Sequence, residues 1–321
     1  NIMKRLCFLV ICMSIIMGCS TSTSSTKALV DYVDPNIGTA HCRWFFYTPA
    51  AIPFGMAKLA PSTDAHLGNP GGWQAVGYDF RHTSIEGFAN FHEFQVGGVV
   101  FAPTVGELQT VPGELENPDG GYRSRFDKKD EVAAPGYYSV LLKDYGVKAE
   151  LTAMKRVGFH RYTYPKTEQA NLIFDIGNKQ GESGEVKDAE VQYFEDGRVE
   201  GYVITSPVYV NIYQKGADVR MYFSAVLNKK PVQVGPFVKD GVNPGKNQEK
   251  GPGAGLYMTF STEEQEAVEV KVGLSYTSIE NARFNRETEA ADVTFDQAKK
   301  NATDVWNESL SRIYVEGGNE T

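Results

Sequence analysis

One segment, residues 31–106, concentrates the side chains of this chain that could bind a ligand. It contains four of the five histidines and two of the three tryptophans: His41, His66, His82, His92, Trp44 and Trp73. Aromatic rings stack on the apolar faces of sugars, and glycine permits the backbone bends from which polar groups reach sugar hydroxyls. The segment therefore indicates a carbohydrate-binding surface. The alternative is a glycine-rich turn region of a large β domain.

Six side chains of this segment are candidates for one wall of a sugar pocket: Trp73, His92, Glu93, Asp64, Tyr78 and Gln95. Trp73 follows the Gly71-Gly72 turn and is the candidate for stacking on a sugar ring, with a packed core indole as the alternative. His92 and Glu93 could form hydrogen bonds with sugar hydroxyls, or they could be polar residues at the end of a strand.

The same segment does not predict a metal site. His82 and Glu86 lie four residues apart, a spacing that brings metal ligands together on a helix, but Gly87 and its strand-like neighbours disfavour a helix. His92 and Glu93 are adjacent and would point to opposite faces of a strand. We therefore assign no metal ligand here.

Strands must position these side chains, because apolar and polar residues alternate along much of the chain after residue 132. The alternating apolar residues are Val147, Ala149, Leu151 and Ala153; Val208, Val210 and Ile212; Val219, Met221 and Phe223; and Val268, Val270, Val272 and Leu274. Asp196-Gly197 predicts a tight hairpin turn. Residues 229–255, rich in proline and glycine, predict a long surface loop or insertion. The fold class predicted is mainly β, a large antiparallel β-sandwich over residues 30–278.

A helix is expected at the end of the chain. Thr294 and Gln297 have the spacing of a capping box. Apolar and small residues then mark one helical face: Ala298, Ala302, Val305, Trp306, Ser309, Leu310 and Ile313. We assign residues 279–321 to a helical linker that follows the sandwich.

The first residues have the pattern of a bacterial lipoprotein signal. Lys4-Arg5 precede an apolar run over residues 6–17, and Gly18 lies just before Cys19. We expect a signal peptide over residues 1–18, lipidation of Cys19 and a tether over residues 19–29. An ordinary secretory signal is the alternative. The expected location is the cell envelope, on the periplasmic side, with the lipid anchor as the only membrane contact.

Cysteine and charge agree with that location. Cys7, Cys12 and Cys19 belong to the signal or the lipid site, so Cys42 has no partner for an intramolecular disulfide and is read as a small buried residue. Removing Lys4 and Arg5 leaves 30 basic against 40 acidic residues and changes the net charge from −8 to −10. That charge argues against nucleic acid as a partner.

Several motifs in a fixed order carry a family resemblance. They are residues 34–39 (DPNIGT), 52–56 (IPFGM), 59–64 (LAPSTD), 77–79 (GYD), 85–88 (IEGF), 97–98 (GG), 272–278 (VGLSYTS), 280–283 (ENAR) and 306–307 (WN). Over residues 30–316 the chain resembles glycoside hydrolase family 92, which consists of calcium-dependent, inverting exo-α-mannosidases. Residues 90–95 (NFHEFQ) depart from the Ser/His/Thr-rich stretch expected there, a departure that bears on linkage specificity.

The resemblance implies that the chain is the N-terminal domain and linker of such an enzyme. The catalytic acid and base would then lie in an (α/α)6-barrel beyond residue 321, together with most calcium ligands, so we assign no catalytic residue here. The expected substrate is terminal mannose of N-glycans or mannans, in α-1,2 linkage, with α-1,3 and α-1,4 as alternatives. The rival functions are a stand-alone glycan-binding lipoprotein and a purely structural sandwich. The sequence does not indicate an oligomeric state.

Overall fold

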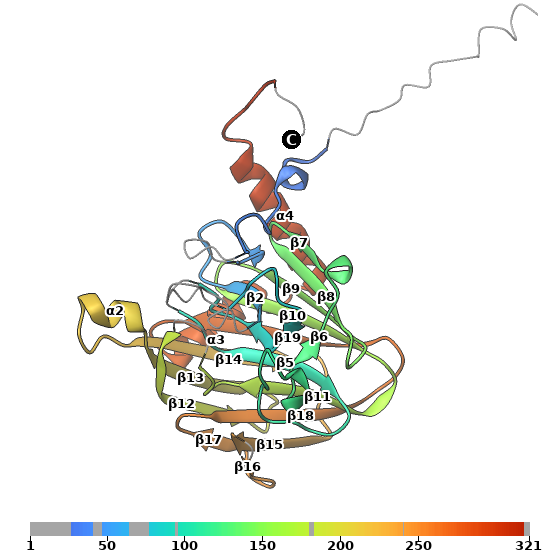
Figure 1. The fold of residues 1–321 in the computed structure, drawn as a ribbon, viewed down its shortest axis with the longest axis vertical. Helices are drawn as coiled ribbons and strands as arrows, with labels where there is room; N and C mark the ends of the chain where they lie inside the picture. Colours follow the sequence, from blue (N-terminus) through green and yellow to red (C-terminus); the bar gives the residue numbers. More distant parts are fainter. Residues whose placement is uncertain are drawn as a thin grey trace, which may run out of the picture.

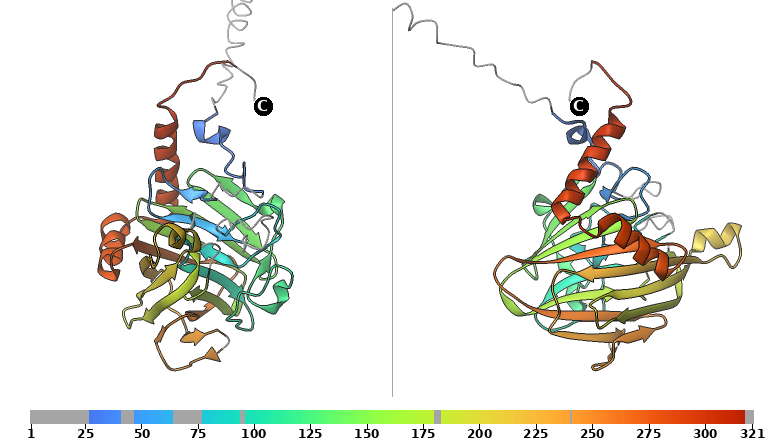
Figure 2. Two further views of the ribbon diagram at one scale, coloured as in Figure 1. Left: turned by 60° about the vertical axis from the view of Figure 1, so that its left-hand side comes forward. Right: turned by 180° about the vertical axis from the view of Figure 1, so that it is seen from behind.

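The computed structural model describes residues 27–40, 47–63, 77–93, 96–179, 183–239 and 241–317. Two large antiparallel sheets face each other (Figure 1, Figure 2). The first has eight strands in the order β1 (Ala50–Ala51), β2 (Lys58–Ser62), β4 (Gly87–Ala89), β5 (Val100–Val105), β11 (Thr167–Asp175), β18 (Ala254–Thr262), β15 (Gln233–Val238) and β16 (Gly241–Val242). The predicted mainly β sandwich is confirmed.

The second sheet has nine strands. Their order is β17 (Gln248–Lys250), β12 (Glu185–Tyr193), β13 (Val199–Ser206), β14 (Val219–Leu227), β19 (Glu266–Ser275), β10 (Val157–Tyr164), β9 (Val147–Ala153), β8 (Tyr137–Leu142) and β7 (Val132–Ala134). A small third sheet pairs β3 (Ser84–Ile85) with β6 (Ser124–Arg125). Short 3-10 turns are η1 (Leu29–Tyr32), η3 (Pro118–Gly120) and η4 (Lys128–Asp130).

The core lies between the two large sheets, as the alternating pattern requires. Every second residue of β19, from Val268 to Leu274, is fully buried. On the facing sheet Phe101 and Phe174 stack with ring centroids 3.9 Å apart. Period-two alternation places one row of apolar side chains on one face of a strand, so two such sheets close on each other.

Two helices cover the outer face of the nine-stranded sheet. They are α3 (Ile279–Ala290), which packs on β14 and β19, and α4 (Phe295–Leu310), which packs on β8, β9 and β10 (Figure 2). The close approach of α3 requires Gly273, because a Cβ there would lie 2.1 Å from the carbonyl oxygen of Ala282. The predicted capping box of α4 is confirmed, with Thr294 and Gln297 bonded to each other's backbone N–H.

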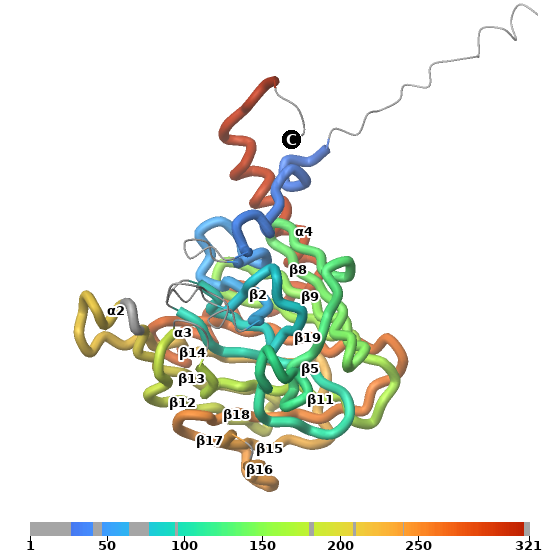
Figure 3. The backbone as a smooth tube through the Cα atoms, in the orientation of Figure 1, coloured from blue at the N-terminus to red at the C-terminus, as the bar shows by residue number. Residues whose placement is uncertain are grey.

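The 3-10 turn η1 lies beside α4 (Figure 3). The backbone N–H of Val30 donates to Asn307 Oδ1 at 3.0 Å, and Trp306 Nε1 donates to the carbonyl oxygen of Ala51 at 2.7 Å. The C-terminal helix therefore fastens the first turn and the first strand of the domain. Within the part of the chain that the structure describes, no helix has the length and apolar character needed to cross a membrane.

One strand prediction is wrong. Val208, Val210 and Ile212, expected in a strand, lie in a short helix, α2 (Val208–Tyr213), that projects from the sandwich between β13 and β14 (Figure 1). The amide of Asn211 explains the difference, because it bonds to Ser206 Oγ and to the carbonyl oxygens of Pro207 and Ala217. These bonds close a compact loop that a strand could not form.

The prediction of a long loop over residues 229–255 is also wrong. This segment forms β15, β16 and β17, and β15 pairs with β18 along its length. Gly235 faces the ring of Tyr257, where a Cβ would come within 2.7 Å of the ring. Glycine at this position therefore makes room for a tyrosine and does not end the strand. The predicted turn at Asp196-Gly197 is confirmed between β12 and β13.

Candidate sugar-binding site

One end of the sandwich carries His92 and Glu93, and we call it the loop end. It is the end at which β2 and β10 begin and β4, β9 and β19 finish. The strand registers establish this. Lys58, at the start of β2, forms an isolated bridge with Phe91, which follows β4. Gly273, near the end of β19, pairs with Val157 at the start of β10. The two sheets meet there, since Met56 N–H donates to the carbonyl oxygen of Lys155 at 2.7 Å.

Glu93 is the centre of a polar cluster at the loop end. Lys58 Nζ donates to its Oε2 at 2.5 Å, and Tyr276 OH donates to its Oε1 at 2.8 Å. Burial, together with the charge of Glu93, raises the pKa of Tyr276, so its hydroxyl remains a donor. Glu93 and Lys58 keep 24% and 31% of their side chains exposed, so this pair is accessible to a ligand.

The Tyr276–Glu93 bond joins two sequence motifs that lie 183 residues apart. Tyr276 was not among our site candidates, although the alternation of β19 offered a signal. Val268, Val270, Val272 and Leu274 all point into the core, and the same parity carries Tyr276 inward at the end of the strand. The sequence around Lys58 gave no comparable indication that its side chain would meet Glu93.

His92 occupies a different environment from its neighbour Glu93. Its side chain is fully buried, and its backbone N–H donates to the carbonyl oxygen of Lys58 at 2.9 Å. Burial lowers the pKa of His92 to about 4, so the ring is neutral near pH 7. Neither ring nitrogen has a hydrogen-bond partner among the described residues. As the sequence predicted, the two adjacent side chains separate, and only Glu93 reaches the surface.

Tyr78 is buried in a second polar cluster. Its ring stacks on Tyr47 at 3.9 Å, and its hydroxyl donates to Glu131 and accepts a hydrogen bond from Lys128. Burial, followed by the nearby Tyr47 and Glu131, raises the pKa of Tyr78. Only 4% of the residue is exposed. Tyr78 therefore packs inside the domain and does not present its side chain on the surface, where we expected it to form part of a wall of the sugar pocket.

Three other candidates, Trp73, Asp64 and Gln95, lie outside the described residues, as do Cys19 and Cys42. The residues that flank 64–76 are described and are held together. Thr63 N–H donates to the carbonyl oxygen of Gly77 at 2.5 Å, and Asp79 N–H donates to Thr63 Oγ1 at 2.9 Å. The two ends of the segment that carries Trp73 are therefore fixed next to each other.

His82 and Glu86 help to support these flanking residues. The His82 ring contacts Thr63 Oγ1 through Nδ1 at 3.0 Å. Glu86 accepts a hydrogen bond from Ser62 Oγ at 2.5 Å and forms a buried ion pair with Arg123. Among the residues that the structure describes, no group of three or more His, Cys, Asp or Glu side chains could hold a metal ion.

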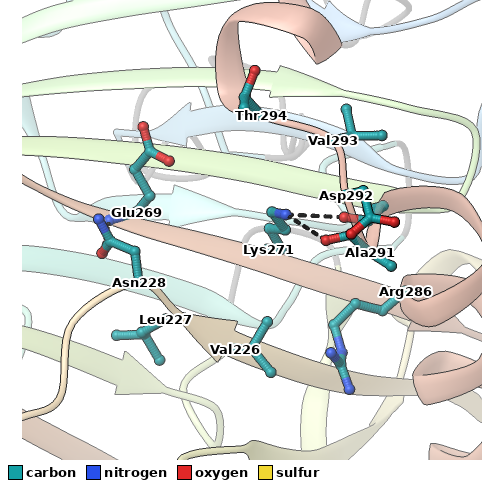
Figure 4. A pocket seen from close by; sticks show the side chains of 11 residues that line it. Val226, Leu227, Asn228, Glu269, Lys271, Arg286, Ala291, Asp292, Val293 and Thr294 are labelled. Atoms are coloured by element: carbon teal, nitrogen blue, oxygen red, sulfur yellow. Dashed lines mark hydrogen bonds between the residues drawn. The ribbon is translucent and has the colours of Figure 1, made fainter.

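Two cavities lie away from the Glu93 cluster. The first, of about 340 Å³, lies where α3 meets α4 (Figure 4). Lys271 Nζ donates there to the carbonyl oxygens of Ala290 and Ala291, at 3.0 and 3.1 Å. A cation at a helix C-terminus satisfies carbonyl groups that have no partner within the helix. We therefore assign Lys271 to the attachment of α3.

The second cavity, of about 740 Å³, lies beside the end of β11 and is lined in part by Asp175, Gly177 and Lys239. Tyr122 OH donates to Asp175 Oδ2 at 2.6 Å. Burial raises the pKa of Asp175 to about 7. This carboxyl group is therefore half protonated at neutral pH, so its protonation contributes to the pH dependence of stability.

The chain is similar to a known protein family and to solved structures of that family. The sequence model of the glycosyl hydrolase family 92 N-terminal domain matches residues 32–275. The structure is similar to that of the family GH92 α-mannosidase BT3965 from Bacteroides thetaiotaomicron, with a TM-score of 0.82 and 28% identity over 92% of this chain. BT3965 in complex with mannoimidazole gives a TM-score of 0.81 at 28% identity.

A more distant relative shares the fold alone. The family GH92 inverting mannosidase BT2199 from the same organism is 21% identical, with a TM-score of 0.73 over 92% of this chain. This chain covers 40% of BT3965, 38% of its mannoimidazole complex and 38% of BT2199. A search of curated proteins gives no match.

Proposed function

We propose a function from the family: this chain belongs to glycosyl hydrolase family 92, and residues 32–275 are its N-terminal domain. The proposal is that the chain forms part of an inverting exo-α-mannosidase that removes terminal mannose from N-glycans or mannans. The family match over residues 32–275 carries it. The mannoimidazole bound by the similar BT3965 supports a mannose-like ligand.

The domain's part in this function is to supply one side of the sugar pocket. A partly exposed carboxylate can accept a hydrogen bond from one sugar hydroxyl while a neighbouring ammonium group donates to another, and Glu93 and Lys58 provide that pair. We propose that Trp73, Asp64 and Gln95 belong to the same wall. The α-1,2 linkage remains our proposed specificity.

The catalytic groups are proposed to lie outside this chain. An inverting glycosidase needs an acid and a base carboxylate about 6.5–9.5 Å apart, with room for a water molecule. The oxygens of Glu93 are engaged by Lys58 and Tyr276. No group of three His, Cys, Asp or Glu side chains among the described residues could hold a metal ion, so we propose that the calcium ligands lie mainly outside this chain.

The test is mannose release by the protein encoded by the complete gene. Incubation with α-1,2-, α-1,3- and α-1,4-linked mannobiose, followed by NMR, should show β-mannose as the first product, most rapidly from the α-1,2 substrate. Chelation with EDTA should abolish activity, and added calcium should restore it. Residues 27–321 alone should fold and release no mannose.

Two outcomes would contradict the proposal. Inverting hydrolysis by residues 27–321 alone would place the carboxylate pair inside this chain. A complete gene product that binds manno-oligosaccharides but hydrolyses none of them would support the rival function, a glycan-binding lipoprotein.

We also propose that the protein is a lipoprotein on the periplasmic side of the membrane, anchored through Cys19. Two acyl chains give stable membrane attachment where one chain does not. A Cys19→Ala variant should lose incorporated lipid label and leave the membrane fraction. Lipid label retained by that variant would refute the anchor, and degradation by protease added to intact cells would refute the periplasmic side.

A further inference from the structure

Phe54 is the most exposed large apolar residue among those described, with 97% of its surface accessible. It lies in the connection between β1 and β2, where Ala51 pairs with Lys58. Its backbone has a φ of 59°, in the left-handed region. A bulky side chain rarely adopts this conformation, and such residues concentrate at ligand-binding sites.

The turn that carries Phe54 is held firmly by its neighbours. Gly55 N–H donates to the carbonyl oxygen of Ile52 at 3.0 Å, and Met56 N–H donates to that of Lys155 at 2.7 Å. On the other side of the hairpin, Trp306 of α4 bonds to Ala51. The backbone therefore fixes the direction in which the Cα–Cβ bond of Phe54 leaves the turn, while the ring itself packs against almost nothing.

Phe54 belongs to the same hairpin as Lys58, which is a member of the Glu93 cluster. Lys58, which donates to Glu93, is four residues further along the same hairpin. Lys155, which accepts from the turn through its backbone, lies at the same loop end. An exposed aromatic ring thus shares the loop end with a partly exposed carboxylate and ammonium group. This combination suits a pyranose ring, which has an apolar face and a rim of hydroxyls.

We propose that Phe54 is a sugar-stacking residue of the pocket, binding the apolar face of a mannose unit whose hydroxyls bond to Glu93 and Lys58. The inference rests on the proposed function and adds a residue to its substrate site. The partly exposed Lys58 and Glu93 at the same end of the sandwich favour a sugar over an apolar protein surface, which would need a continuous apolar patch.

The experiment compares Phe54→Ala and Phe54→Tyr with a matched control, Phe284→Ala. Phe284 is also an exposed phenylalanine, at 60%, but it lies on α3. Saturation-transfer NMR with α-1,2-mannobiose measures binding to the 321-residue chain, where affinity is expected to be weak. In the complete enzyme the readout is kcat/KM.

We expect Phe54→Ala to lower affinity and kcat/KM about tenfold, because stacking on one face removes roughly half of the ring from water. Phe54→Tyr should retain both, and Phe284→Ala should change neither. The melting temperature of every variant should match the wild type. A lower melting temperature of the complete Phe54→Ala enzyme, with unchanged sugar binding and unchanged activity per folded molecule, would overturn the proposal and assign Phe54 to protein packing.

The two proposals can fail separately. If the complete wild-type protein releases no mannose but Phe54→Ala still weakens sugar binding, the enzymatic function is wrong and the stacking role stands. If the wild-type enzyme is active and Phe54→Ala changes neither kcat/KM nor binding, the stacking role is wrong. If no mannobiose binds and no mannose is released, both are overturned.

Discussion

Glu93 and Glu150 use the same kinds of partner in two different regions. Each accepts a hydrogen bond from a tyrosine hydroxyl and forms an ion pair, Glu93 with Tyr276 and Lys58, Glu150 with Tyr137 and Arg161. Glu93 lies at the loop end with 24% of its side chain exposed, whereas Glu150 lies on the outer face of the nine-stranded sheet with 7% exposed.

The surroundings of Glu150 explain its role. Arg161 also bonds to Asp296 at 3.0 Å and lies over the ring of Phe295, both in the first turn of α4. Burial raises the pKa of Glu150, but hydrogen bonds from Arg161 and Tyr137 outweigh it and lower the pKa to about 2. The Glu150 cluster therefore anchors a helix. The comparison teaches that the kinds of partner do not reveal the role of a carboxylate, whereas its exposure and the elements it joins do.

The largest expected effect is a loss of stability in acid that does not arise from Glu93 or Glu150. Lowering the pH from 6.5 to 4 should reduce the free energy of unfolding by about 3 kcal/mol. Burial lowers the pKa of His92 to about 4 and of His160 to about 3, so in this range only the unfolded state protonates them. Asp175, with a pKa raised to about 7, opposes this, because the folded state keeps its proton.

The net difference from these three groups is one proton bound by the unfolded state, or about 1.4 kcal/mol per pH unit. His82, whose pKa is also lowered by burial, adds to the decline. Urea denaturation at several pH values measures it. Asp175→Asn removes the opposing contribution and should make the decline about twice as steep. Glu150 stays ionised here, and its own contribution should be lost only between its ordinary pKa and about 2. A stability that is constant between pH 6.5 and 4.5 would contradict the assigned burial of the two histidines.

Breaking the anchor should have the next largest effect. Arg161→Ala leaves Glu150 with Tyr137 and the exposed Lys148 as its remaining partners and frees the start of α4, so we expect a loss of about 2–3 kcal/mol and a fall in melting temperature of roughly 5 to 10 °C. Calorimetry measures the change. The matched control is Lys166→Ala, which removes an exposed pair with Glu263 (side chains 67% and 76% accessible) and should cost almost nothing. Equal effects of both variants would contradict the anchoring role.

Glu93→Gln should separate stability from function. We expect a stability loss of about 1 kcal/mol or less, because the ion pair with Lys58 is partly screened by water. In the complete enzyme, kcat/KM for mannobiose should fall about tenfold, as for one lost charge-assisted hydrogen bond. If the same substitution instead unfolds the domain without altering the activity of the folded fraction, Glu93 resembles Glu150 after all.

The smallest effect is expected for Tyr276→Phe, which removes one hydroxyl. The loss of its hydrogen bond to Glu93 should cost about 1 kcal/mol in chemical denaturation. A double-mutant cycle with Glu93→Gln should give a coupling of about 0.5 to 1 kcal/mol, the size typical of residues in direct contact. Strictly additive losses would mean that the Tyr276–Glu93 bond does not form in solution.

Local patterns in the sequence determined much of the fold. The alternation from Val268 to Leu274 predicts the buried face of β19, because a strand turns successive side chains to opposite faces. Asp196-Gly197 predicts its hairpin, because glycine adopts the positive φ that the turn needs, here 89°. The capping box of α4 depends on two residues three apart. Each of these predictions uses an interaction between near neighbours in the chain.

Only the tertiary structure decided which candidates reach the surface. Six residues from Val208 are equally compatible with a short helix and a strand, and the bonds of Asn211 to its surroundings select the helix. The sequence could propose that His92 and Glu93 separate, but which of them is buried depends on the packing of the strands around them. Lys58 and Tyr276 meet Glu93 from two other strands, 35 and 183 residues away. Such partners are brought together by sheet pairing and core packing, and no periodicity within one segment records them.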